Sequence, residues 1–319
     1  MGKSSSPTTD ATGGAKRSRR QALAMLLGAC RGLPQAAAAT GNAPVRMAIS
    51  ESMVSDVNLN DARAAMTIWI KRMEADLNVV VELSPKVFDS TEEILRRARN
   101  GQLDCVALNV VEYRQIADLL DPHEVIAEGG ASGPEQYVLL VNRKSGVHQL
   151  GDLRGRRLCI LKGPKMCVAD AWLSTTLDAN HFGASEQFFS SLVTDAKASR
   201  VVLPVFFGQA DACLTSKRSF ETMCELNPQV AKDLTAIATS PVLVVTFYIF
   251  HKNYRGVSRE RFAKVYSNLP SSVAGRQLAT LFQFESLVVK ETSCLTPALN
   301  LLETAERVRN RRGAGGRKG

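Results

Sequence analysis

Polar side chains suited to ligand binding follow two short apolar segments in the first part of the chain. Ser50 and Ser52 come directly after the apolar segment 45–49, and Asn109 comes directly after 105–108. Ligands of open α/β sheets bind beyond the carboxyl ends of the strands, and free backbone N–H groups at helix starts suit anions. We therefore expect these side chains to line a site for a small, anionic solute.

The same reasoning selects side chains in loops further along the chain. Lys165 and Met166 follow the apolar segment 158–161 and a Lys-Gly-Pro turn, where Lys165 can neutralise an anion. A Phe-Phe-Gly-Gln-Ala-Asp turn and the Ser-Pro dipeptide 240–241 are further candidate loops. The expected ligand contacts are Ser50, Ser52, Asn109, Tyr113, Tyr137, Lys165, Met166, Phe206, Gln209, Asp211 and Ser240.

The residue types that carry catalysis or bind metals show no pattern of that kind. The histidines are scattered, and none has an evident Ser or Cys partner for a nucleophilic site. The cysteines show no CxxC or His-rich spacing, so neither a zinc nor a haem site is expected. Met53 and Met166 are too few to indicate a soft metal. The sequence predicts a protein that is not an enzyme and has no cofactor.

Strand and helix patterns alternate twice along the chain. The first set predicts strands at 45–49, 79–83 and 105–108 and helices at 61–74, 90–99 and 111–120. The second set predicts strands at 136–141, 158–161, 187–189, 212–215 and 242–250, with helices at 169–177 and from 196. Mostly helical sequence is expected after the last strand. This alternation indicates mostly parallel sheets with right-handed crossovers.

The restart of the pattern after residue 150 indicates a second lobe inserted into the first. We expect crossings between the lobes near 132–136 and 234–241. The predicted fold class is α/β with two lobes, and the ligand cleft is expected between the lobes. Lobe 1 comprises 45–134 plus 241–305, and lobe 2 comprises 135–240.

The net charge of +9 is concentrated at the two ends of the chain. Residues 1–39 carry six basic and one acidic side chain, and residues 307–319 carry six basic and no acidic ones. The remaining segment, 40–306, has 28 basic and 30 acidic residues and is almost neutral. This distribution argues against nucleic acid as the partner. Residues 306–319 are expected to form a basic, disordered tail.

Residues 1–39 have the features of an export signal. Ser18-Arg19-Arg20 forms a twin-arginine pattern, an apolar run extends from Ala22 to Cys30, and an alanine-rich segment follows. Two processing routes stay open: cleavage near Ala38 or Ala39, or lipidation of Cys30 within a Leu-Gly-Ala-Cys sequence. Either route places the protein in the periplasm.

Four stretches resemble the type-2 periplasmic solute-binding proteins, in the phosphate-, phosphite- and phosphonate-binding branch of ABC-transporter components. They are DSTEEILRRARNGQLDCVALNVVEY (89–113), YVLLVNRKSGVHQLGDLRGRRLCI (137–160), FFGQADACLTSKRSFETM (206–223) and LTAIATSPVL (234–243). The resemblance extends from about Val45 to Asn268, and it implies the two-lobed periplasmic binding protein-like fold type II. The resemblance implies a monomeric binding protein that closes on a small solute and delivers it to an ABC permease.

The resemblance leaves the ligand and the partner open. Phosphonate-binding relatives carry a Ser/Thr-rich run at the head of the first helix of lobe 2, where this chain has Gly163-Pro164-Lys165-Met166-Cys167-Val168. Phosphate esters, sulfonates, organic acids and metal chelates are therefore alternatives to phosphonate. Delivery to a membrane sensor kinase is the alternative to a permease, and an enzyme on the same fold is a third, weaker one.

Overall fold

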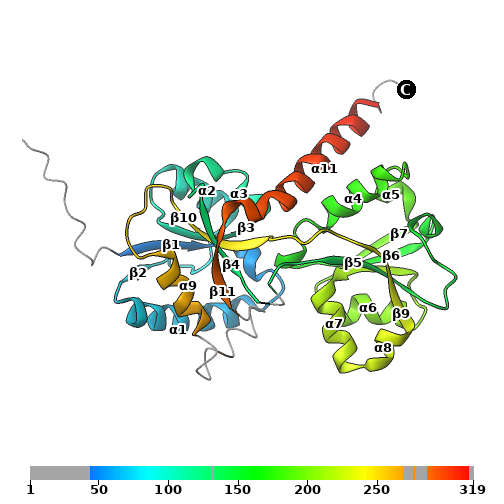
Figure 1. Ribbon diagram of the computed structural model, residues 1–319, viewed down its shortest axis with the longest axis horizontal. Coiled ribbons are helices and arrows are strands. Elements are labelled where there is room, and N and C mark those ends of the chain that lie inside the picture. Colours follow the sequence, from blue (N-terminus) through cyan, green and yellow to red (C-terminus); the bar gives the residue numbers. More distant parts are fainter. Residues whose placement is uncertain (1–43, 131–132, 269–275, 277–285, 316–319) are drawn as a thin grey trace, which may run out of the picture. The chain divides into compact units, whose positions relative to one another are not determined.

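The chain folds around two β-sheets, one in each lobe, as the computed structural model shows (Figure 1). The structure describes residues 44–130, 133–268, 276 and 286–315. The first lobe contains β1 (Val45–Ile49), β2 (Val81–Glu82), β3 (Cys105–Asn109), β4 (Glu124–Glu128), β10 (Thr246–Phe250) and β11 (Leu287–Glu291). Their order in the sheet is β11-β4-β10-β3-β1-β2.

The second lobe is formed by the part of the chain between β4 and β10. Its strands are β5 (Tyr137–Asn142), β6 (Arg157–Leu161), β7 (Ser191–Asp195), β8 (Ala212–Ser216) and β9 (Leu234–Thr239). They form a sheet of order β7-β6-β8-β5-β9. The two-lobed α/β fold that the sequence predicts is therefore confirmed.

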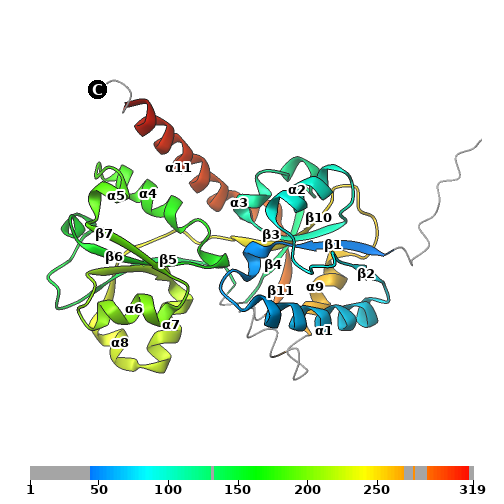
Figure 2. The same cartoon turned by 180° about the vertical axis from the view of Figure 1, so that it is seen from behind.

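Helices cover both faces of each sheet, which explains the apolar strands. In the first lobe they are α1 (Leu59–Leu77), α2 (Thr91–Arg99), α3 (Val110–Tyr113) and α9 (Arg259–Ser267). In the second lobe they are α4 (Ala169–Ala179), α5 (Ser185–Phe188), α6 (Ala198–Phe206), α7 (Lys217–Leu226) and α8 (Pro228–Asp233). Figures 1 and 2 show α2 and α3 on one face of the first sheet and α1 and α9 on the other. Every residue of β3 is accordingly buried.

Side-chain caps fix where the helices of the first lobe begin and end. The Asn58 side chain accepts hydrogen bonds from the backbone N–H groups of Asn60 and Asp61, and α1 ends at Asn78 in the left-handed conformation. Ser90 Oγ accepts a hydrogen bond from the N–H group of Glu93 at the start of α2. The helix start predicted at Ser90 is thus confirmed.

The two segments that connect the lobes lie side by side. Glu135 and Leu243 form an isolated antiparallel bridge between them. The N–H group of Tyr137 donates to Ser240 Oγ at 2.8 Å, and the N–H group of Ser240 donates to the Tyr137 carbonyl at 2.8 Å. These bonds tie the two connections into one short ribbon.

Both sheets are mixed rather than mostly parallel, which corrects the expectation from the sequence. In the first sheet, β1 is parallel to β2 and β3, whereas β10 is antiparallel to β3 and β4, and β11 is antiparallel to β4. In the second sheet, β5 is antiparallel to β8 and β9. The strands β5 and β10 directly follow the connections between the lobes. Each of these two strands therefore begins at the edge of its sheet where the neighbouring strands end, and it runs antiparallel to them.

Several element boundaries also differ from the predicted ones. Residues 185–188 form α5 and the strand follows at 191–195, where a strand at 187–189 was expected. The strand predicted at 242–250 begins only at Thr246, because the preceding residues belong to the connection between lobes. The predicted helix 111–120 is divided into α3 and a 3-10 turn at Ala117–Leu119. Strands β4, β9 and β11 have no counterpart in the prediction.

The C-terminal residues form a helix, α11 (Thr296–Gly315), in place of the expected disordered tail over 306–315. Residues 316–319 lie outside the described residues. Leu302, Ala305 and Val308 are buried along one side of α11, so the basic segment continues an amphipathic helix that begins before it.

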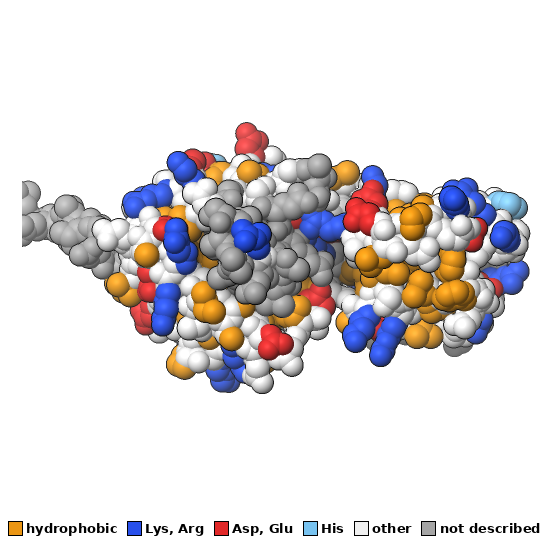
Figure 3. Space-filling view, turned by 90° about the horizontal axis from the view of Figure 1, so that it is seen from below, with side chains coloured by type: hydrophobic (Ala, Val, Ile, Leu, Met, Phe, Trp, Pro, Cys, Tyr) orange, Lys and Arg blue, Asp and Glu red, His pale blue; other side chains and the backbone are white. Residues whose placement is uncertain are grey.

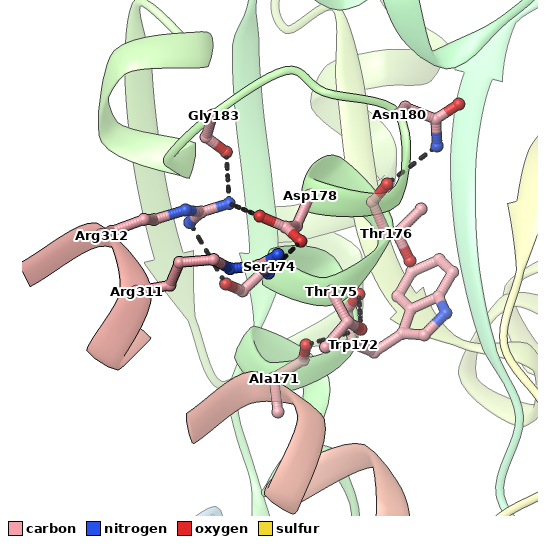
Figure 4. A network of polar contacts seen from close by, with 10 residues as sticks. All are labelled: Ala171, Trp172, Ser174, Thr175, Thr176, Asp178, Asn180, Gly183, Arg311 and Arg312. Atoms are coloured by element: carbon pink, nitrogen blue, oxygen red, sulfur yellow. Dashed lines mark hydrogen bonds and ion pairs between the residues drawn. The ribbon is translucent and has the colours of Figure 1, made fainter. Parts of the chain in front are cut away.

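Helix α11 contacts both lobes. Arg114, at the end of α3, forms a bidentate ion pair with Glu306 at 2.9 and 2.7 Å. Figure 4 shows Arg311 and Arg312 reaching Asp178 of α4 in the second lobe. Arg312 also donates to the Gly183 carbonyl at 2.8 Å. In Figures 1 and 2, α11 accordingly runs from beside α3 toward α4.

The described surface carries charges of both signs. Figure 3 shows Lys and Arg side chains interspersed with Asp and Glu side chains on the described face of both lobes. The expected export signal at 1–39, with Cys30, lies outside the described residues. Within the described chain, none of the helices combines the length and the apolar character that a bilayer span requires.

Candidate functional site

A pocket lies where strands of both sheets end. It is lined by Ile49 at the end of β1, Glu128 at the end of β4, Leu161 at the end of β6, Ser216 at the end of β8 and Thr246 at the start of β10. This is the edge at which ligands of open α/β sheets bind. The pocket encloses about 170 Å³, below the roughly 300–1,000 Å³ of pockets that hold drug-sized ligands, so it suits a small solute.

The two lobes meet beside this pocket. Asp56 and Met53 belong to the segment after β1, and Gly163, Pro164 and Lys165 follow β6 in the second lobe; all of them line the pocket. A Cβ atom placed on Gly163 would lie 3.4 Å from Asp56 Oδ2. Such a Cβ atom would make an ordinary van der Waals contact, so the two segments lie next to each other at this point.

The charged groups of the pocket pair across the lobes. Lys165 Nζ lies 2.6 Å from Glu128 Oε2 and 3.4 Å from Glu135 Oε1. An Arg218 guanidinium nitrogen lies 2.8 Å from Glu128 Oε1. Lys165 and Arg218 belong to the second lobe, and Glu128 to the first. One carboxylate of the first lobe therefore forms ion pairs with two basic groups of the second.

Burial governs the ionisation of Glu135 in the connecting segment. Glu135 is 4% exposed, and this burial raises the pKa of its carboxyl group. The positive charge of Lys165 opposes that rise in the pKa without cancelling it. Together these groups form a site in which basic and acidic side chains are closely matched, so an entering anion competes with Glu128 for Lys165 and Arg218.

Of the predicted contacts, Lys165 and Met166 line the pocket. Ser50, Ser52 and Asn109 are brought together beside it, where they surround the carboxylate of Glu112. Ser50 Oγ donates to Glu112 Oε1 at 2.5 Å, and Ser52 Oγ donates to Glu112 Oε2 at 2.9 Å. The Asn109 side-chain amide donates to Ser52 Oγ at 2.9 Å. These three selected polar side chains therefore form a hydrogen-bond network around the carboxylate of Glu112.

Tyr113, Tyr137 and Ser240 occupy supporting positions. Tyr113 is buried and packs edge-to-face on Phe247, a residue of the pocket wall. Tyr137 is buried in the second lobe, and its hydroxyl group donates to the Lys165 carbonyl at 2.8 Å. Burial raises the pKa of this hydroxyl group well above the usual value. Ser240 bonds to Tyr137 in the connecting ribbon. Tyr137 thus links the ribbon to the turn that carries Lys165.

The structure places Phe206, Gln209 and Asp211 at the other end of the second sheet. Asp211 Oδ2 accepts a hydrogen bond from the N–H group of Arg157, the first residue of β6, whereas the pocket lies beyond the last one. The Phe206 carbonyl accepts from Asn142 at the end of the antiparallel strand β5. The turn containing these residues precedes β8, whereas the pocket is lined by Ser216 at the end of β8 and by Arg218 and Ser219 after it.

Sequence reasoning missed Arg218, Glu128 and Glu135. A signal for Arg218 is present, because Lys217-Arg218-Ser219 directly follows the apolar strand β8. Ser216 at the end of that strand lines the pocket together with Arg218 and Ser219. Glu128 ends a strand that was not predicted. Glu135 lies in a connection whose path depends on both lobes, so the sequence carries no local signal for it.

The thiols of the described residues are free, and burial affects the pKa of several of them. Burial raises the pKa of Cys105, Cys167 and Cys213, which are free thiols. Across residues 44–130, 133–268 and 286–315, His, Cys, Asp and Glu side chains form no cluster that would hold a metal ion.

Comparison with known proteins identifies what this arrangement is similar to. Residues 52–291 match the family model described as the periplasmic phosphonate substrate-binding protein of an ABC transporter. No curated protein sequence matches the chain.

Solved structures share the fold at low sequence identity. A binding-protein component of an ABC phosphonate transporter from Pseudomonas aeruginosa aligns with a TM-score of 0.53 at 15% identity, over 83% of this chain and 88% of that one. PhnD1 from Prochlorococcus marinus, in complex with methylphosphonate, aligns with a TM-score of 0.54 at 16% identity, over 84% and 98%. A Xanthomonas citri protein bound to ATP gives 0.55 at 13% identity, over 85% and 99%.

Proposed function

This chain belongs to the family of periplasmic phosphonate substrate-binding proteins of ABC transporters, and we propose that the solute it captures is a small anion bound by Lys165 and Arg218. Membership of the family makes it a solute-binding component for a membrane permease and not an enzyme. We propose the chemical class of the solute and the residues that bind it.

The observation that carries the proposal is the pair of basic groups in the pocket. Lys165 and Arg218 both lie within 2.8 Å of the Glu128 carboxylate, which supports the proposal that these two groups can bind negatively charged oxygen atoms. A phosphonate or phosphate group presents the same kind of oxygen, with more of them and more charge. Met166 and Phe247, which also line the pocket, would contact the apolar part of an organic anion.

Capture by lobe closure is consistent with the paired connections between the lobes. We assign residues 45–134 and 241–305 to lobe 1 and residues 135–240 to lobe 2. Opening would then bend the ribbon around Glu135, Tyr137 and Ser240, and closing would bring Glu128 and Asp56 of lobe 1 back to Lys165 of lobe 2. The solute is enclosed in this motion.

The family places the protein in the periplasm, and we propose that residues 1–39 direct it there. The twin-arginine pattern at Ser18-Arg19-Arg20 would send the folded chain through the twin-arginine export route. The alanine-rich segment before Thr40 supports cleavage near Ala38 or Ala39 over lipidation of Cys30. Mass spectrometry of the exported protein distinguishes the two products by mass.

Calorimetric titration with methylphosphonate, inorganic phosphate, methanesulfonate and acetate tests the proposed ligand class. Lys165→Ala and Arg218→Ala should each weaken binding of the preferred anion at least about tenfold, which corresponds to about 1.4 kcal/mol. Each substitution removes one charged partner of the anion.

The matched control is Lys144→Ala, which removes a lysine that is 83% exposed and lies in the turn after β5, away from the pocket. It should bind with wild-type affinity. Equal losses in Lys144→Ala and Lys165→Ala would show that overall charge, and not the pocket, attracts the anion. Binding that survives both pocket substitutions would refute the assigned residues.

A further inference from the structure

The carboxylate of Glu112 occupies a cradle of hydrogen-bond donors in the first lobe. Ser50 Oγ and Thr91 Oγ1 donate to Oε1 at 2.5 and 2.7 Å. Ser52 Oγ and the N–H group of Asn109 donate to Oε2 at 2.9 and 3.1 Å. Each carboxylate oxygen therefore receives two hydrogen bonds.

The cradle is enclosed and is assembled from separate segments of the chain. Glu112 is 5% exposed, Ser50 is 1% exposed and Asn109 is 6% exposed. The donors come from the segment after β1, from the start of α2 and from the end of β3. The bond from the Asn109 N–H group is part of a capping box, in which the Asn109 side chain accepts from the Glu112 N–H group in return. The three hydroxyl donors come from other segments, and hydroxyl groups gathered in this way can hold the oxygens of any oxyanion.

The cradle adjoins the ligand pocket. Ile49 and Met53 flank Ser50 and Ser52 in sequence, and both line the pocket. The pKa of the Cys167 thiol in the second lobe is raised to about 12. Burial is the largest cause of this rise, and the charge of the nearby Glu112 carboxylate is the second largest. The carboxylate therefore lies at the meeting of the two lobes, beside the space that the solute enters.

We propose that Glu112 determines ligand specificity by acting as the internal occupant of an oxyanion site in the first lobe. Its carboxylate satisfies the donors, excludes the oxyanion of a solute from them, and leaves Lys165 and Arg218 of the second lobe as the groups that bind it. A small side chain at position 112 would leave the same donors free for the solute. This inference rests on the proposed function, because it assigns the solute anion to one side of the pocket.

The test opens the cradle and supplies the missing anion from solution. Glu112→Ala removes the carboxylate, whereas Glu112→Gln fills the same space with a neutral amide and serves as the matched control. Acetate and inorganic phosphate are the probes. We expect either anion to raise the melting temperature of Glu112→Ala in a concentration-dependent manner, by clearly more than that of Glu112→Gln or the wild type.

Combination with Lys165→Ala separates this inference from the proposed function. Phosphate should bind Glu112→Ala about tenfold tighter than the wild type. The Glu112→Ala, Lys165→Ala double variant should also bind phosphate more tightly than Lys165→Ala alone. If the wild type binds none of the anions, the second-lobe site fails, while the response of Glu112→Ala to acetate still tests the cradle.

Two results would overturn the inference. One is an anion response of Glu112→Ala no larger than that of Glu112→Gln. The other is an Ala variant that fails to fold with or without acetate while the Gln variant folds, since Glu112 would then be a structural residue only. An Ala variant that folds only in the presence of acetate or phosphate supports the inference.

Discussion

At the scale of single residues, the pocket depends on how a few buried charges are balanced. Glu128 contacts both Lys165 and Arg218, and Glu135 lies 3.4 Å from Lys165. Removing one partner of a buried ion pair is costly, because the other charge stays behind without compensation. The ionisation state of Glu135 therefore affects both the stability of the fold and the charge of the site.

Glu135 predicts a specific pH dependence. Burial raises its folded-state pKa above the ordinary value, so the folded protein takes up this proton more readily than the unfolded chain. Its contribution thus favours folding in acid and is lost as the pH rises through the raised pKa. We expect Glu135→Gln to gain stability relative to the wild type as the pH rises from about 4 to 8, as measured by urea unfolding.

The control for this measurement is Glu82→Gln, which changes an exposed carboxylate at the edge strand β2. Its difference from the wild type should stay nearly constant over the same range. A Glu135→Gln variant that loses stability as the pH rises would show that the ion pair with Lys165 outweighs the cost of burial.

The sequence predicts residues at this scale only where a local rule applies. Ser50, Ser52 and Asn109 were selected because they follow apolar strands, and the structure brings them together. Their common partner, Glu112, lies three residues after Asn109, which is the spacing of a capping box, and the structure contains that box at the start of α3. The hydroxyl donors Ser50, Ser52 and Thr91 come from distant segments, so no local rule assigns them to Glu112. Asp211 was selected from a motif alone, and the direction of β8 places it at the other end of the sheet.

At the scale of elements, α11 is the feature that the sequence most clearly failed to predict. Its basic composition suggested disorder, but Leu302, Ala305 and Val308 bury one side of it, and Arg311 and Arg312 bond to α4. The partners that order it come from residues more than 100 positions earlier in the chain. Strands β4, β9 and β11 were missed for a similar reason, because antiparallel neighbours from distant segments complete them.

The contact between α11 and α4 predicts a salt-sensitive contribution to stability. Replacing Arg311 and Arg312 together by Ala should lower the free energy of unfolding in urea by about 1 kcal/mol at low ionic strength, and by less in 1 M salt. The Gly183 carbonyl and Asp178 would lose their charged donors.

The matched control for the double variant is Arg307→Ala. It removes an arginine of the same helix that pairs with Glu303 one turn earlier and makes no ion pair with the second lobe. Its loss of stability should be smaller. Equal losses in the two variants would indicate that arginines support α11 itself and not its contact with α4.

At the scale of the whole molecule, the two lobes are joined by a ribbon of two short segments. The N–H group of Tyr137 donates to Ser240 Oγ, and Glu135 pairs with Leu243. Tyr137 also contacts the turn carrying Lys165 through its hydroxyl group. The ribbon therefore links the connection between the lobes to the turn that carries Lys165, the side chain proposed to bind the ligand.

Ser240→Ala tests this connection. Without the hydroxyl group, the buried N–H group of Tyr137 has no acceptor, which should cost about 1–3 kcal/mol of unfolding free energy. We also expect weaker binding of the preferred anion in calorimetry, because the ribbon no longer fixes the relation between the lobes. Ser240→Thr keeps the hydroxyl group and should retain both properties. An Ala variant that is destabilised but binds normally would separate the ribbon from ligand capture.

The position of Glu128 also has a consequence for how the binding protein interacts with its permease. A permease must distinguish loaded binding proteins from empty ones, and a closed shape is the form that a loaded protein offers. In this chain Glu128 of the first lobe forms ion pairs with Lys165 and Arg218 of the second, and these contacts would favour a closed form even before a solute enters. Empty copies would then compete with loaded copies for the transporter, and the strength of one carboxylate's contacts would set how many transport cycles are spent without cargo.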